Sequence, residues 1–120
     1  MKRILLVEAH NVFREVLASE LDRMPNLEVA AQASSLAEAR SAASLGGIDI
    51  ACVAHDLPDG DGFELVRELR DVQPHSIPTL VVLTTSLDPA VHDLALQAGA
   101  SDVLTTRASF EELLHTLIRI

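Results

Sequence analysis

The stretch Leu80-Val81-Val82-Leu83-Thr84 is the strongest strand signal in the chain. Uninterrupted apolar runs of this kind are expected where a strand is buried on both faces of a parallel sheet. Similar runs cover residues 4–7 and 48–53, and weaker ones cover residues 27–31 and 102–105. The sequence therefore predicts five short strands.

A segment with helical periodicity follows each of these runs. We predict N-caps at Asn11, Ser35, Asp61, Asp88 and Ser109, because each precedes apolar positions spaced three and four residues apart. A Glu three residues after the second, third and last of these caps completes a capping box. Five βα units with short connections indicate an α/β fold, in which helices cover both faces of one parallel sheet. We expect a single domain over residues 1–120.

The composition excludes several classes of function. Among 120 residues, 9 Lys and Arg stand against 18 Asp and Glu, so the net charge is -9 and the domain is predicted not to bind nucleic acid. The longest apolar run is too short to cross a bilayer and no signal peptide is evident, so we expect no membrane association. Cys52 is the single cysteine, which excludes internal disulfides and favours a reducing cytoplasm.

The carboxyl ends of the predicted strands are the place to look for a site, because ligands of such sheets bind there. The residues at these ends are 8–10, 54–56, 84–85 and 105–107. This placement predicts a location and does not yet name a chemistry.

Several motifs together resemble the receiver domain of response regulators in two-component signalling. They are Leu6-Val7-Glu8-Ala9-His10, residues 56–62, Leu83-Thr84 and Ala98-Gly99-Ala100, and they extend over essentially the whole chain. Residues 10–15 read His-x-x-Phe-Arg-Glu, which is similar to the subgroup in which a helix-turn-helix output domain follows the receiver. The resemblance implies a flavodoxin-like (βα)5 doubly wound sheet with strand order 2-1-3-4-5. It also implies a role in phosphorelay signal transduction or transcription regulation in bacteria.

The resemblance implies a phosphorylation site that this chain does not preserve. In the family, an acidic pair after the first strand holds Mg²⁺, which prefers oxygen ligands, and an Asp after the third strand accepts the phosphoryl group. Carried over to this chain, the acidic pair becomes Glu8 and Ala9, and the phosphoacceptor, four residues before Pro58, becomes Ala54. Because alanine has no oxygen, we expect the phosphoacceptor to be lost and Mg²⁺ binding to be lost or very weak. No cofactor is expected.

Three further family positions fall on Thr84, Thr106 and Val103. The family hydroxyl that contacts the phosphoryl oxygens is kept as Thr84, whereas the family lysine becomes Thr106 and the aromatic switch residue becomes Val103. Phosphoryl transfer needs cationic stabilisation of its equatorial oxygens, which Thr106 does not supply.

Two neighbours are candidates to replace the missing groups. Asp56 lies two residues past Ala54 and would point the same way on a strand, so Glu8 and Asp56 are the remaining carboxylates for a metal ion. We interpret Asp56 as a solvated turn residue and Glu8 as an acceptor for nearby backbone N–H groups. We interpret Arg107 as a surface residue, because adjacent residues of a strand face opposite sides.

Other chemistries fit the strand ends less well. His10, His55 and Glu8 are zinc-ligand types, but no HxH or HxxxH spacing supports a zinc site. The sequence contains no Gly-x-Ser-x-Gly, Walker A or dinucleotide motif, and with three Phe and no Trp or Tyr it lacks aromatics to flank a flavin. We interpret Cys52 as an inert core residue and predict that the domain is not an enzyme.

The sequence therefore predicts a pseudo-receiver, which acts as a phosphorylation-independent binding or dimerisation module. A protein partner or a second copy is expected on the fourth helix, fifth strand and fifth helix, or on the first and fifth helices. Exposed candidates are Asp88, His92, Arg107, Phe110 and His115, with a core role slightly favoured for Phe110.

Two alternatives stay open. Either engineered alanines at positions 9 and 54 inactivate a working receiver, or the neutralised pocket senses a small ligand. Contact with DNA would require an output domain beyond the given sequence, and the unfinished apolar pattern at residues 117–120 suggests truncation of a longer protein.

Overall fold

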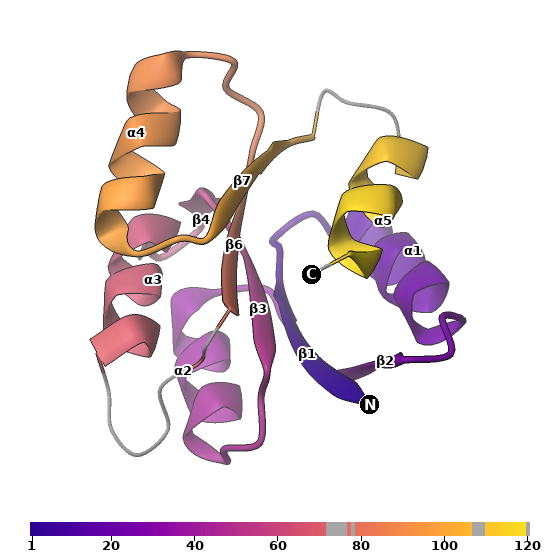
Figure 1. The fold of residues 1–120 in the computed structure, drawn as a ribbon. Coiled ribbons are helices and arrows are strands. Elements are labelled where there is room, and N and C mark those ends of the chain that lie inside the picture. The colour runs from indigo at the N-terminus through magenta and orange to yellow at the C-terminus, as the bar shows by residue number, and fades with distance from the viewer. Residues whose placement is uncertain (72–76, 78, 107–109, 120) are drawn as a thin grey trace.

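The computed structural model describes residues 1–71, 77, 79–106 and 110–119, and it confirms the predicted parallel sheet. The five strands are β1 (Lys2–Val7), β2 (Leu27–Ala33), β3 (Ile50–Ala54), β6 (Thr79–Thr84) and β7 (Asp102–Thr105). They pair in parallel in the order β2-β1-β3-β6-β7 (Figure 1). Because two very short strands intervene in the numbering, this is the predicted 2-1-3-4-5 order of a flavodoxin-like fold.

In the described part of the chain, five helices cover the two faces of the sheet. The helices α1 (Asn11–Asp22) and α5 (Phe110–Ile118) lie on one face, and α2 (Leu36–Ser44), α3 (Gly62–Asp71) and α4 (Pro89–Ala98) lie on the other (Figure 1). Among the described residues, no helix is both long and apolar enough to cross a membrane.

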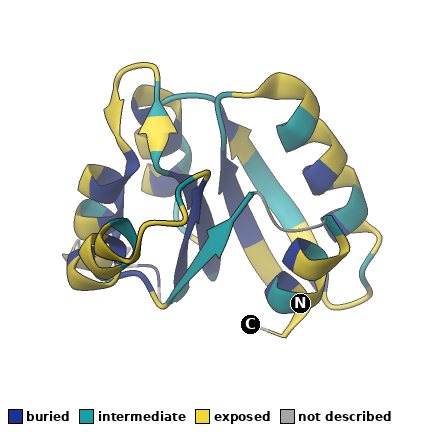
Figure 2. Cartoon of the chain, turned by 90° about the horizontal axis from the view of Figure 1, so that it is seen from above, coloured by how far each residue is buried: buried dark blue, intermediate teal, exposed yellow. Residues whose placement is uncertain are grey.

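The helices explain why the strands are continuously apolar. Successive side chains of β6 point to opposite faces, so Leu80 and Val82 join the buried cluster beside α2, α3 and α4. Val81 and Leu83 join the second cluster, beside α1 and α5. The central strands are accordingly buried, while β7 at the sheet edge is only half-buried (Figure 2).

A small antiparallel pair follows β3 where the sequence predicted only a turn. The strands β4 (Asp56–Leu57) and β5 (Gly60–Asp61) form this pair, which we call the hairpin. At its tip, the Asp59 carboxylate accepts hydrogen bonds from the N–H groups of Leu36 (2.7 Å) and Ala37 (3.1 Å). The hairpin therefore caps α2, a contact that the local sequence does not reveal.

The helix caps agree with the sequence only in part. The predicted cap Asn11 is wrong, because His10 occupies the N-cap and its Nδ1 accepts from the N–H of Phe13 at 3.3 Å. The imidazole replaces the short side chains that usually cap helices, and Asn11 becomes the first helical residue. Ser35 caps α2 as predicted, but Glu38 accepts from the N–H of Ser34 instead of closing a box onto Ser35.

The remaining predicted caps are at the starts of α4, α3 and α5. Asp88 accepts from the N–H of Ala90 at the start of α4, as predicted. Asp61 accepts from the N–H of Phe63 at 2.8 Å and so begins α3. The predicted cap Ser109 lies outside the described residues.

The glycine at the start of α3 is required by the close approach of β3. The Gly62 N–H donates to the carbonyl oxygen of His55 at 2.8 Å, and a Cβ at Gly62 would collide with the carbonyl oxygen of Ala54. The absence of a side chain at this position lets the hairpin turn back tightly against the end of β3.

Candidate functional site

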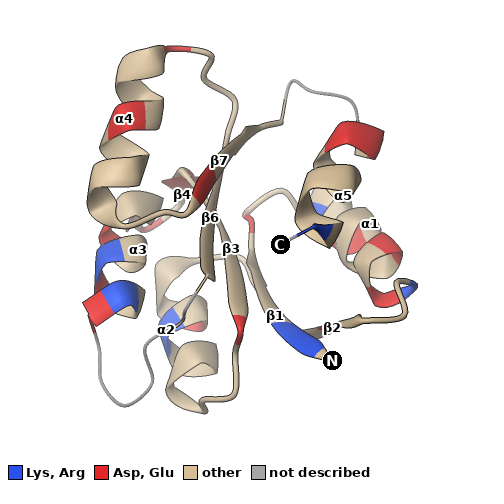
Figure 3. Ribbon diagram, in the orientation of Figure 1, with Lys and Arg blue, Asp and Glu red and all other residues tan. Residues whose placement is uncertain are grey.

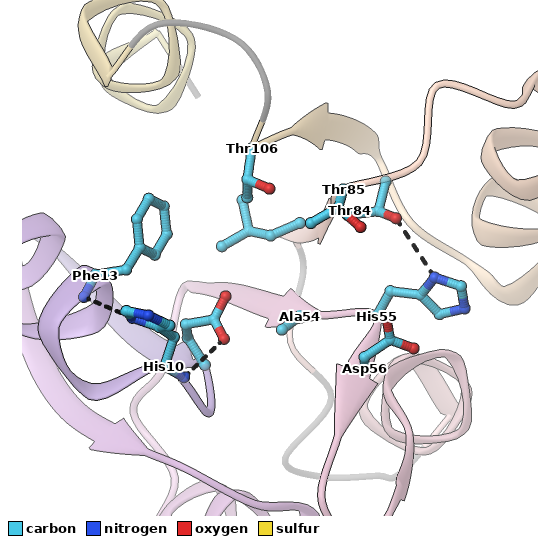
Figure 4. A pocket seen from close by; sticks show the side chains of 10 residues that line it. His10, Phe13, Ala54, His55, Asp56, Thr84, Thr85 and Thr106 are labelled. Carbon is cyan, nitrogen blue, oxygen red and sulfur yellow. Dashed lines mark hydrogen bonds between the residues drawn. The ribbon is translucent and has the colours of Figure 1, made fainter.

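A pocket of about 350 Å³ opens at the carboxyl ends of the central strands (Figure 4). Its walls come from the ends of β1, β3, β6 and β7, from the start of α1 and from the hairpin. The lining residues are Glu8, His10, Phe13, Ala54, His55, Asp56, Leu83, Thr84, Thr85 and Thr106. The pocket therefore lies at the edge of the sheet that the strand pattern predicted.

Most of the predicted site residues meet in this pocket. Glu8, Ala54, Asp56, Thr84 and Thr106 all line it, although they come from separate parts of the chain.

Two predicted positions are not among the lining residues. Ala9 was predicted for the pocket, but it is not among the residues that line it. Val103, the predicted switch position, is half-buried and packs against the cluster beside α2, α3 and α4.

Glu8 is held by the loop that leads into α1. Its Oε2 accepts a hydrogen bond from the N–H of His10 at 3.1 Å, and its carbonyl oxygen accepts from Nη1 of Arg14 at 2.8 Å. The predicted interpretation of Glu8 as an acceptor for a nearby backbone N–H is therefore confirmed.

Ala54 and Asp56 differ in burial. Ala54 ends β3, where it pairs with Leu83 of β6, and is only 4% exposed. Asp56 begins the hairpin and is exposed at the rim of the pocket. A methyl group thus occupies the buried position at the strand end, and the carboxylate two residues later lies toward the solvent.

The geometry gives little support for a metal ion. Within the described part of the chain, no group of three or more His, Cys, Asp or Glu side chains is placed to hold one. The two histidines that suggested zinc have other contacts: His10 caps α1, and Nδ1 of His55 lies 3.4 Å from Oγ1 of Thr84.

Thr84 is the buried polar group of the pocket, with 3% of its surface exposed. Its Oγ1 accepts from the N–H of Ser86 at 3.1 Å and contacts the imidazole of His55. The Thr84 carbonyl oxygen accepts from the N–H of Thr106 at 2.8 Å, which ties the segment after β7 to the end of β6.

The sequence did not reveal the contacts of the His55 ring. The ring stacks on Phe63, with centroids 4.3 Å apart and an interplanar angle of 4°, and its Nε2 lies 3.9 Å from Oδ1 of Asp61. A histidine directly after a buried strand was the available signal, and it had suggested only a metal ligand.

The charge of the pocket is set by carboxylates. Glu8 and Asp56 line it, and none of the described lining residues is Lys or Arg. Arg107, the candidate replacement for a lysine, lies outside the described residues. Cys52 is fully buried in β3, and this burial raises the pKa of its thiol to about 12, as expected of an inert core residue.

The residues predicted for a partner surface have different surroundings. Asp88 caps α4, and Nε2 of His92 lies 2.9 Å from the carbonyl oxygen of Ser86. Phe110 packs edge to face on Phe13, with ring centroids 6.4 Å apart, which confirms the favoured core role. His115 is exposed on α5.

Comparison with known proteins agrees with this architecture. The sequence model of the response regulator receiver domain matches residues 4–118. The DNA-binding transcriptional activator DevR/DosR of Mycobacterium tuberculosis is 37% identical over 84% of this chain and 46% of its own length. The transcriptional regulatory protein UhpA of Salmonella typhimurium is 32% identical over 98% of this chain and 59% of its own. The chain thus spans about half the length of these curated relatives.

A solved structure gives the same result in three dimensions. The LuxR-family two-component response regulator from Aurantimonas superposes with a TM-score of 0.86 at 27% identity, and the match covers 98% of this chain and 82% of that one. The motif-based resemblance, the sheet order and these similarities therefore agree.

Proposed function

This chain belongs to the response-regulator receiver family, and we propose that it is a pseudo-receiver that binds a protein partner without being phosphorylated at residue 54. The observation that carries the proposal is Ala54. Its methyl group stands at the buried end of β3, where it lines the pocket together with Glu8 and Thr84, and it has no atom that can accept a phosphoryl group. We infer a regulatory, non-enzymatic role in bacterial two-component signalling or transcriptional control.

Two further family positions support the same function. Ala9 removes one carboxylate of the family's Mg²⁺ pair, and Thr106 replaces the family's lysine, so both charge-stabilising elements of phosphoryl transfer are missing. The described lining residues include Glu8 and Asp56 but no Lys or Arg, so none of them supplies a cation to stabilise the phosphoryl oxygens during transfer.

We place the partner on the side of the molecule formed by α4, β7 and α5. The side chains of Leu87 and Leu94 are 61% and 52% exposed there. These three elements contain acidic residues (red in Figure 3) and no Lys or Arg, and the blue segment that directly follows α5 is Arg119. A second surface, on α1 and α5, exposes Val12, Val16 and Ile118 and is the other place for a protein partner or a second copy.

A small-ligand sensor is the second candidate function, because the size and lining of the pocket suit a small molecule. The cavity of about 350 Å³ has apolar walls from Phe13 and Leu83 and hydroxyl groups from Thr85 and Thr106. A combination of apolar walls with a few polar groups is typical of small-molecule sites.

Two further parts of the proposal concern the whole protein. Since the chain spans about half the length of its curated relatives, contact with DNA would be made by an output domain outside this sequence. We place the protein in the cytoplasm, where the free thiol of Cys52 remains reduced.

Intact mass after incubation with Mg²⁺ and acetyl phosphate tests the proposal. We expect the wild-type mass to stay unchanged, while a receiver that carries the phosphoacceptor Asp gains one phosphoryl group under the same conditions. Beryllofluoride, monitored through the amide shifts of Glu8 and Thr84, provides a second measurement that needs no covalent bond. A covalent phosphoryl group on the wild-type chain, or saturating beryllofluoride shifts at these residues, would overturn the pseudo-receiver function.

A further inference from the structure

A chain of side-chain contacts leads from the end of β3 to the first turn of α4. It begins at His55, whose Nδ1 lies 3.4 Å from Oγ1 of Thr84, and it continues to the N–H of Ser86, which donates to the same Oγ1 at 3.1 Å. Oγ of Ser86 accepts from the N–H of Asp88 at 3.1 Å, and the Ser86 carbonyl oxygen contacts Nε2 of His92 at 2.9 Å. The pocket and α4 are thereby connected through hydrogen bonds.

The hydrogen-bond roles along this chain are consistent with one tautomer of His55. Because Oγ1 of Thr84 accepts from the Ser86 N–H, its own O–H is available to donate to Nδ1 of His55. In this tautomer the ring proton is on Nε2, which faces Oδ1 of Asp61 at 3.9 Å. We assign this tautomer because it lets each ring nitrogen of His55 face a group of the opposite hydrogen-bonding role.

The His55 ring is well placed to fix Thr84. The backbone of His55 is held by two hydrogen bonds of 2.8 Å. The His55 N–H donates to the carbonyl oxygen of Leu83, and the His55 carbonyl oxygen accepts from the N–H of Gly62. The ring lies flat on Phe63, with centroids 4.3 Å apart. Rotation of the imidazole away from Thr84 would break this stacking contact.

We infer that the His55 imidazole is an internal latch that holds the segment from Thr84 to α4 in one conformation without a phosphoryl group. The Thr84 hydroxyl, which the family directs toward the phosphoryl oxygens, is here engaged by His55 and Ser86. This inference rests on the proposed function, because it assumes a receiver fold that stays unphosphorylated and still keeps one fixed conformation.

Amide hydrogen exchange at Ser86 and Asp88 tests the latch in the full chain, followed by NMR with no phosphoryl donor present. His55→Phe keeps an aromatic ring on Phe63 but removes the nitrogen that accepts from Thr84. We expect exchange at both amides to become about fivefold faster, the effect of losing one typical hydrogen bond. Exchange in the β1 amides provides the internal reference for global stability and should not change.

Thr84→Val and Thr84→Ser test whether His55 acts through the hydroxyl. Thr84→Val removes the hydroxyl from a buried side chain of similar shape, so it should accelerate exchange at Ser86 and Asp88, and His55→Phe should then add nothing further. Thr84→Ser keeps the hydroxyl and should restore near-wild-type exchange. The matched control is His10→Phe, which alters the other pocket histidine and should affect α1 and leave α4 unchanged.

Three results would overturn the latch. They are unchanged exchange in His55→Phe, an equal further acceleration by His55→Phe in the Thr84→Val background, and an equal effect of His10→Phe on α4. Each is separate from the test of the proposed function, since a phosphoryl group gained by the wild-type chain changes its mass and is not read out in these exchange rates.

Discussion

At the scale of single residues, the chemistry of the pocket is governed by what stands at positions 9 and 54. Ala54 is buried at the end of β3, and Glu8 is the one carboxylate directly after β1. Mg²⁺ in proteins is commonly held through carboxylate oxygens, so Glu8 alone offers a poor site. The same backbone would carry three carboxylates if both alanines were Asp.

Restoring these two carboxylates is therefore expected to create a response to Mg²⁺. Ala9→Asp combined with Ala54→Asp should be stabilised by about 2.7 kcal/mol when Mg²⁺ is present at about 100 times its Kd. The wild-type chain should show no such gain. Thermal unfolding with and without Mg²⁺ measures the difference, and the Ala9→Asn and Ala54→Asn pair provides a control of similar size without charge. An equal gain in the wild-type chain would contradict the expected loss of the metal site.

The Cys52 thiol is expected to resist modification in the folded protein. Burial raises its pKa to about 12, so the reactive thiolate is scarce and inaccessible at neutral pH. Mass spectrometry after iodoacetamide treatment should show an unlabelled native chain and a singly labelled chain in denaturant. Rapid labelling without denaturant would show that β3 opens in the native state.

At the scale of elements, the hairpin and α2 are joined through Asp59. Its carboxylate accepts from the N–H groups at the start of α2, and the hydrogen bond from Leu36, followed by that from Ala37, lowers the pKa of Asp59 from its ordinary value of 3.8. A carboxylate at this end of a helix also interacts favourably with the helix dipole. Through this contact the hairpin, which borders the pocket, is held against α2.

Asp59→Asn is expected to lower the stability of the protein at neutral pH. Because the folded-state pKa of Asp59 lies below the ordinary 3.8, its contribution is present above about pH 4 and disappears as pH falls through the folded-state value. The unfolding midpoint of the variant should therefore lie below wild type at pH 7 and approach it at low pH. Urea unfolding across this range measures both.

The matched control for this prediction is Asp56→Asn in the same hairpin. Asp56 is exposed, and among the described residues its carboxylate has no hydrogen bond. We expect little change in its unfolding midpoint at any pH. A loss in Asp56→Asn as large as that in Asp59→Asn would assign the effect to charge and not to the cap.

At the scale of the whole molecule, periodicity in the sequence was sufficient to predict the layers but not the contacts between them. Leu80 to Leu83 alternate between two buried clusters, and that burial on both faces explains the continuous apolar run from which a parallel sheet was predicted. Glu8, Ala54, Thr84 and Thr106, which the motifs predicted for one pocket, all line the same pocket.

What the sequence did not predict depends on residues far apart along the chain. Asp59 caps a helix 23 residues earlier, and His55 contacts a hydroxyl 29 residues later. Such pairs are determined by how the strands align, and one sequence contains no local signal for them. The His10 cap was missed for a different reason, since histidine is not among the side chains that usually cap helices.

At the same scale, a measurement of self-association distinguishes the two candidate partners, a second copy of this chain and a different protein. If the exposed leucines of α4 pair with a second copy, two chains of net charge -9 must approach each other, so association should strengthen as salt screens their repulsion. Sedimentation at increasing protein and salt concentrations should then show a dimer, which Leu94→Asp abolishes. Leu45→Asp, at an 86% exposed site after α2, is the control and should behave as wild type. If the protein stays a monomer at every protein and salt concentration, charge repulsion cannot explain the missing dimer, because salt would have screened it. That result would exclude a second copy of this chain as the partner and leave a different protein as the proposed partner.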